Sequence, residues 1–151
     1  MAYDGTINIT GNVVATTCQI NGQATPATVA VALPTVSASA IAPTAGKTPF
    51  KIALTGCTGG ATTVHTYFEP GSTINANGRL TSGVTNVDVE LLNGNDSTPI
   101  VLGVADASQN SHTTPIVAGA ATQNYFAQYR SGGSPGTGAV STSVTFSIAY
   151  Q

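Results

Sequence analysis

The side chains best suited to chemistry in this chain are two cysteines and two histidines. Cys18 and Cys57 lie 39 positions apart, and His65 and His112 are also far from each other in the sequence. A cysteine–histidine nucleophile needs a free thiol with a lowered pKa. Neither cysteine has a histidine or a second cysteine at the spacing of metal ligands. The sequence therefore predicts no metal site and no thiol-based catalytic centre.

Both cysteines fall in segments with the alternation of β-strands. Cys57 closes the alternating run Phe50–Gly56. We interpret the pair as an inter-strand disulfide formed in an oxidising compartment, which would stabilise the domain by about 4 kcal/mol. Two buried free thiols are the alternative.

The acidic residues offer little support for catalysis either. Asp88 and Glu90 are two positions apart, so they share one face of a strand, where we expect two exposed acids. The segment Asn93–Asp96 is typical of a tight turn rather than a cation site. His65 alternates with its neighbours in a predicted strand and is expected to face solvent. We therefore predict neither an enzyme nor a cofactor.

The elements that position these side chains are predicted to be strands. No window has the apolar spacing of an amphipathic helix, and the chain contains 17 Gly and 8 Pro. Ser37–Lys47 remains open between a short helical turn and a crossover loop, and Ser131–Gly138 is predicted to be a flexible loop. Short strands between Gly, Pro and Asn turns predict an all-β antiparallel sandwich. The expected strands are 3–11 continuing into 12–20, 27–33, 50–54, 64–69, 87–92, 100–104, 114–118, 125–129 and 140–150.

Composition narrows the class of protein further. The 151 residues are expected to form one domain, and only 7% are charged, against about 25% in ordinary soluble domains. Four basic side chains cannot form the basic patch of a nucleic-acid-binding protein. No apolar run of 18 residues is present, so we expect no membrane insertion. The start at Met1 shows no signal peptide, so secretion would require that the numbering begins at a mature or engineered start.

The two ends of the chain carry the clearest strand patterns. If the final strand lacked a neighbour, a hydrophobic groove would open beside it, and an extended peptide with alternating apolar residues could fill the groove by strand addition. Residues 3–11 are such a peptide, although they could also pair within their own domain as a first strand. The alternating residues are Tyr3, Gly5, Ile7 and Ile9 at the start and Val144, Phe146, Ile148 and Tyr150 at the end.

Together these motifs resemble the pilins of chaperone–usher fimbriae, of the type 1 and P-pilus kind. The similarity covers nearly the whole chain, apart from residues 80–121, which match no motif. It rests on the alternating arm that contains Gly5, Gly11-Asn-Val-Val before Cys18, Cys57 after Phe-x-Ile-x-Leu, Tyr125-x-Ala-x-Tyr, and Val144-x-Phe-x-Ile-x-Tyr-Gln at the C-terminus.

The resemblance implies an incomplete immunoglobulin-like sandwich, with six strands plus an exchanged N-terminal strand. Residues 1–11 would be the donor-strand extension and 12–151 the pilin domain. Tyr3, Gly5, Ile7 and Ile9 would enter the groove of a neighbouring copy. Val144, Phe146, Ile148 and Tyr150 would border the acceptor groove and bind the chaperone. Cys18 and Cys57 would form the disulfide across the first two strands.

The function that follows from the resemblance is that of a structural subunit, with the shaft or major subunit expected because one domain leaves no room for a lectin domain. Its partners would be copies of itself, a periplasmic chaperone and an outer-membrane usher, and its location an extracellular fimbria reached through the periplasm. The alternative is a self-contained secreted sandwich that binds carbohydrate. That alternative is disfavoured because the sequence has no Trp and only 6% aromatic residues.

Overall fold

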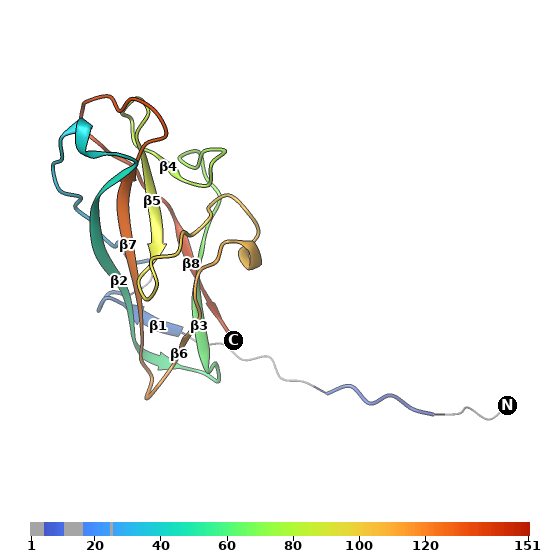
Figure 1. Ribbon diagram of the computed structural model, residues 1–151. Coiled ribbons are helices and arrows are strands. Elements are labelled where there is room, and N and C mark those ends of the chain that lie inside the picture. Colours follow the sequence, from blue (N-terminus) through green and yellow to red (C-terminus); the bar gives the residue numbers. More distant parts are fainter. Residues whose placement is uncertain (1–4, 11–16, 25) are drawn as a thin grey trace.

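The protein is built from two antiparallel sheets with almost no helix (Figure 1). The computed structural model describes residues 5–10, 17–24 and 26–151. The larger sheet has the strand order β1-β2-β7-β5-β4, and the smaller sheet has the order β6-β3-β8. The strands are β1 (Thr17–Ile20), β2 (Thr44–Thr58), β3 (Thr63–Phe68), β4 (Leu80–Thr81), β5 (Asp88–Asn93), β6 (Thr114–Pro115), β7 (Ala121–Arg130) and β8 (Phe146–Tyr150).

The core lies between the two sheets, because each strand directs one apolar face inward. In β3, buried Val64, Thr66 and Phe68 alternate with half-buried residues, and β7 buries Ala121, Gln123 and Tyr125 in the same way. This is the period of two that a sandwich requires. The ring of Phe68 meets that of Tyr125 edge-on, with the centroids 5.9 Å apart. The all-β sandwich predicted from the sequence is therefore confirmed.

The first strand is held to the second by a disulfide. Cys18 in β1 and Cys57 in β2 are bonded, with their Cα atoms 4.1 Å apart. Cys18 is buried in the main core cluster, and Cys57 packs against the same cluster. The predicted inter-strand disulfide is confirmed, and the alternative of two free thiols is wrong.

The predicted strands 27–33 and 100–104 are not strands in the structure, and the predicted strand 140–150 is shorter than expected. Residues 27–33 form no ladder, residues 100–104 form a loop, and the C-terminal strand begins at Phe146 instead of Val140. The alternation of 27–33 and 140–145 is real, because it buries one side of each segment. Among the described residues, neither segment has a neighbouring strand that completes a ladder of hydrogen bonds with it. The loop at 100–104 instead bonds back to Leu91, Gln109 and Gly78.

Three residues expected to be exposed are not. Asp88 is half-buried, and its carboxylate lies 3.1 Å from Nε of Arg79. The side chain of His65 is 12% exposed because the loop with the short 3-10 helix η2 (Asp106–Ser108) covers it. Glu90 is 5% exposed, and it accepts hydrogen bonds from Gln128 and Arg130 of the adjacent strand β7. Pattern alone did not reveal the partners of Glu90, since they lie about 40 positions away in the sequence.

Other predictions fall on turns and on the N-terminal region. The turn at Asn93–Asp96 and the loop at 131–138 are confirmed, and Ser37–Lys47 contains the short 3-10 helix η1 (Ala38–Ala40). Residues 5–10 form no strand. Tyr3 and residues 11–16 lie outside the described residues. Within the described ranges, no helix has the length and apolar character needed to cross a membrane.

Candidate functional site

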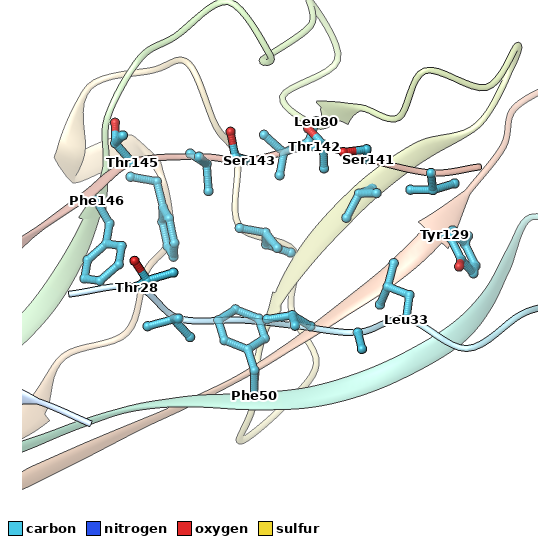
Figure 2. A pocket seen from close by; sticks show the side chains of 18 of the residues that line it. Thr28, Leu33, Phe50, Leu80, Tyr129, Ser141, Thr142, Ser143, Thr145 and Phe146 are labelled. Carbon is cyan, nitrogen blue, oxygen red and sulfur yellow. The ribbon is translucent and has the colours of Figure 1, made fainter. Parts of the chain in front are cut away.

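An open groove runs along the sandwich between two extended segments that are far apart in the sequence. Its volume is about 1360 Å³, and its walls are residues 26–36 and residues 136–150. Figure 2 shows Thr28 and Leu33 on one side and Ser141, Ser143 and Thr145 on the other. We call this cavity the groove from here on.

The floor of the groove is apolar because the sheet strands below it present their inward faces. Phe50 and Ile52 come from β2, and Val89 and Leu91 come from β5. Their alternation in sequence places all four on the same side of the larger sheet. Ile52 is 1% exposed and Val89 is 4% exposed. The floor is thus the hydrophobic core itself, reached from outside.

The first wall, residues 26–36, is extended but unpaired. Ala27, Val29 and Leu33 are half-buried against the core. The amide of the Gln23 side chain both donates to the carbonyl of Thr28 and accepts from its backbone N–H, each at 3.2 Å. These contacts hold the wall near Thr28 and against the core, while no strand of the described chain pairs with it.

The second wall includes β8, which is the edge strand of the smaller sheet. The backbone of Gln151 exchanges hydrogen bonds with Thr63, and the carbonyl of Thr145 accepts from Glu69. Odd-numbered residues therefore direct their backbone groups toward β3. Because the direction alternates along a strand, Phe146, Ile148 and Tyr150 direct theirs into the groove. These groups are available to pair with an added strand.

The side chains predicted to border the groove do line it. Val144, Phe146, Ile148 and Tyr150 are all half-buried and pack against the core cluster, although each is large and apolar enough for full burial. Burial raises the pKa of Tyr150, and a hydrogen bond with the backbone of Cys18 acts in the opposite direction. That contact places Tyr150 beside β1, at one end of the groove.

The N-terminal arm is not in the groove. In Figure 1 residues 5–10 lie away from the two sheets. Ile7 and Ile9 are 87% and 90% exposed, the largest exposures among the large hydrophobic side chains described. Gly5 has no atom within 4 Å of where a Cβ would stand. The structure thus separates the predicted donor residues from the groove-lining residues.

The histidines serve as structural residues in this fold. Nε2 of His65 contacts both carboxylate oxygens of Asp106, at 2.8 and 2.9 Å, which ties the η2 loop to β3. Nδ1 of His112 contacts the side chain of Asn95 at 2.8 Å. Within the described residues, no cluster of three His, Cys, Asp or Glu side chains is placed to hold a metal ion.

One wall of the groove was missed as a site by the sequence analysis. Residues 27–33, within this wall, were predicted as an ordinary strand, and Tyr129 was predicted only as part of another strand. The relevant signal was present in the alternation of Ala27, Val29 and Leu33. It did not reveal that the neighbouring strand position is open, because periodicity reports which face is buried and not which edge is paired.

The arrangement defines a class of protein. In the part of the chain that the structure describes, it is an immunoglobulin-like sandwich open at one strand position, with an apolar floor between two edges that no further strand pairs with. The chemistry available there is main-chain hydrogen bonding together with burial of alternate apolar side chains, which is what an extended strand requires.

Comparisons with known proteins agree with this class and give the family. Residues 33–151 match the family model described as the type-1 fimbrial protein, A. The chain is 39% identical to the "F17 fimbrial protein" of Escherichia coli, covering 100% of this chain and 89% of that protein. It is 41% identical to the "Major fimbrial subunit SMF-1" of Stenotrophomonas maltophilia (strain K279a), covering 99% and 94%. The chain therefore belongs to the type-1 fimbrial protein family.

Solved structures show the same fold at lower sequence identity. The P pilus rod subunit PapA superposes with a TM-score of 0.67 at 20% identity, covering 89% of this chain and 99% of that one. A subunit in a chaperone–usher pilus structure superposes with a TM-score of 0.68 at 19% identity, covering 98% and 96%. The family consists of structural fimbrial subunits and not of enzymes, so the chain is a fimbrial subunit of surface pili.

Proposed function

We propose that this chain is the major shaft subunit of its pilus and that it polymerises by donor-strand exchange. The N-terminal arm of one copy enters the groove of the next and supplies the strand that the groove lacks. The proposal is carried by two complementary features of the same chain. The groove has unpaired edges on both sides, and the arm has the apolar residues with the period needed to fill it.

The dimensions of the arm and the groove support this assignment. An extended chain rises about 3.3 Å per residue, so residues 3–11 span about 30 Å. The second wall, residues 136–150, is long enough to pair with all nine of them. Burial of Ile7 and Ile9 would contribute about 2 kcal/mol each. The backbone hydrogen bonds along both edges would add about 1 kcal/mol each. In this assignment residues 1–11 are the donor extension and residues 12–151 are the pilin domain.

The shaft role is favoured by the named relatives. One relative at 41% identity is described as a major fimbrial subunit, and one protein with the same fold is described as a pilus rod subunit. An open groove is also an aggregation hazard before assembly. We therefore assign a periplasmic chaperone as the transient occupant of the groove beside Val144, Phe146, Ile148 and Tyr150. An outer-membrane usher would then hand the subunit to the fibre.

The proposal is tested on a denaturing gel with purified protein loaded before and after boiling. We expect an unboiled ladder of multiples that collapses on boiling, because an exchanged strand dissociates slowly. Deletion of residues 1–11 should abolish the ladder, and adding that segment as a peptide should leave a monomer with a filled groove. A single monomer band for the full chain under both conditions would contradict polymerisation through the arm.

A further inference from the structure

The few charged side chains of this chain are separated by sign between the two outer faces of the sandwich, which are the faces turned away from the core. Lys51 of β2 is exposed between Phe50 and Ile52, which pack in the core, so its side chain lies on the outer face of the larger sheet. Lys47 lies on the same face, because its Nζ stands 4.3 Å from the ring centroid of Phe126, an outward residue of β7.

The two arginines lie on this face as well, and each is paired there. Arg130 contacts Glu90 at 3.4 Å, and Arg79 contacts Asp88 at 3.1 Å. Both acids alternate with core residues of β5, which places them on the outer side. All four Lys and Arg residues of the chain are therefore on the outer side of the larger sheet. Among the described residues, no carboxylate lies within ion-pair distance of either lysine.

The outer face of the smaller sheet carries the opposite sign. Glu69 follows the buried Phe68 and accepts a hydrogen bond from the hydroxyl of Ser147 in β8. It forms no ion pair within the described ranges. Asp106 lies over the same face, where it contacts His65, and its side chain is 41% exposed. Since every Lys and Arg is on the other sheet, this face holds two carboxylates and no permanent cation.

The surroundings of Lys51 and Glu69 allow another surface to approach closely, because most neighbouring side chains are short. These neighbours are Pro49, Thr122 and Asn124 on the larger sheet and Ser147 and Ala149 on the smaller sheet. Stacked sheets lie about 10 Å apart, a gap that a lysine and a glutamate can bridge together when their neighbours are short. Tyr67, half-buried on the smaller sheet, adds an aromatic ring of the kind enriched at protein interfaces.

We propose that the outer face of the larger sheet in one copy packs against the outer face of the smaller sheet in another copy, with Lys51 opposite Glu69 and Asp106. This contact joins two different surfaces, so it does not close on a pair of copies and can repeat along a filament. A single exposed ion pair contributes little to affinity. The strength of the contact therefore rests on the proposed polymer, in which many such contacts form between copies that are already linked.

The test is carbodiimide cross-linking of the full-length chain, with the linked peptides identified by mass spectrometry. The reagent joins a lysine amine directly to a carboxylate that touches it. Because Lys51 and Glu69 lie on opposite faces of one copy, a link from Lys51 to Glu69 or Asp106 reports a contact between copies. We expect these links at an ionic strength of about 0.01 M. They should be lost at about 1 M, since the screening length falls from about 30 Å to about 3 Å.

Charge reversal tests the pairing of these residues. Glu69→Lys places a second cation opposite Lys51, so the link from Lys51 to Asp106 should fall about tenfold. The double variant Lys51→Glu, Glu69→Lys should restore a link between positions 51 and 69. The control is Asn77→Lys, which adds a positive charge in the exposed turn before the edge strand β4 and should leave the native links unchanged.

The unboiled gel ladder is recorded on the same samples, so that this proposal and strand exchange can fail separately. A ladder without links from Lys51 to Glu69 or Asp106 would overturn the packing of the two faces and leave strand exchange intact. Links without a ladder would support the packing and overturn strand exchange. A link from Lys51 to Asp106 that is as strong in Glu69→Lys as in the native chain would also overturn the packing, as would a double variant that restores no link.

Discussion

The hydroxyl of Tyr129 in β7 donates a hydrogen bond of 2.8 Å to the carbonyl oxygen of Pro34, 95 positions earlier in the chain. This bond ties the first wall of the groove to the floor at one end. Tyr129 also belongs to a small second core cluster with Ile41 and Val87, against which Leu33 packs. The position of residues 26–36 is thus fixed by β7 rather than by pairing with another strand.

Tyr129→Phe removes this bond and leaves the ring in place. We expect a loss of about 1 kcal/mol in the free energy of unfolding, since the Pro34 carbonyl keeps part of its access to water. Guanidinium unfolding of the monomeric full-length chain measures the change. Tyr67→Phe on the outer side of β3 is the matched control, because the Tyr67 hydroxyl has no hydrogen-bond partner among the described residues. Equal effects of both variants would mean that the bond to Pro34 does not hold the wall.

The arm provides a prediction in which neighbouring positions behave differently. If alternate side chains enter the groove, Ile7→Asp or Ile9→Asp buries a carboxylate in an apolar channel, which is strongly unfavourable. Asn8→Asp places the same charge on the side facing away. We expect the first two variants to abolish the unboiled ladder and the third to retain it. Loss of the ladder in all three would show that net charge, and not strand register, controls assembly.

The groove provides the reciprocal prediction. Ile148→Ala removes part of the surface that an incoming strand would cover, so a fluorescent peptide of residues 1–11 should bind arm-deleted protein about tenfold more weakly. Val117→Ala is the matched control, because Val117 is 67% exposed on the hairpin between β6 and β7. Fluorescence anisotropy measures both affinities. Equal binding by both variants would place the peptide somewhere other than the groove.

Much of this architecture follows from the sequence, because burial leaves a record in side-chain alternation. The C-terminal residues Val144 to Tyr150 were predicted to border a groove, and they line it. What the sequence did not reveal depends on contacts across long separations. Glu90 is buried because Arg130 and Gln128 lie across the ladder, and residues 27–33 fail to form a strand because their neighbour is missing. Neither fact affects local periodicity.

The disulfide gives a prediction about stability. The bond between Cys18 and Cys57 closes a loop over a separation of 39 positions, which by the chain-entropy model contributes about 4 kcal/mol. Reduction should therefore shift the guanidinium midpoint of the full-length chain downward. The double variant Cys18→Ala, Cys57→Ala should show the lower midpoint without reductant and no further change when reductant is added. A midpoint that falls with reductant in the double variant as well would point to an effect unrelated to this bond.

Tyr125 predicts how stability depends on alkaline pH. Burial raises the pKa of Tyr125 above its ordinary value of 10.0, and hydrogen bonds with Ser111 and Thr66 act in the opposite direction. Between the unfolded and folded pKa the native state holds a proton that the unfolded chain has released, so stability falls as pH rises. The stabilisation is complete below about pH 10 and is lost as pH passes through the folded pKa.

Tyr125→Phe keeps the ring that packs against Phe50 and Phe68 and removes the ionisable hydroxyl. The slope of unfolding free energy against pH above 10 should therefore be smaller in this variant than in the native chain. Tyr150→Phe removes a second phenol with a raised pKa, and its effect should be weaker because Tyr150 is more exposed. Unfolding curves at pH 8 to 11 provide the measurement, on the scale where Tyr ionises at about 10. Identical slopes for the native chain and Tyr125→Phe would mean that ionisation of Tyr125 does not cause the loss of stability at alkaline pH.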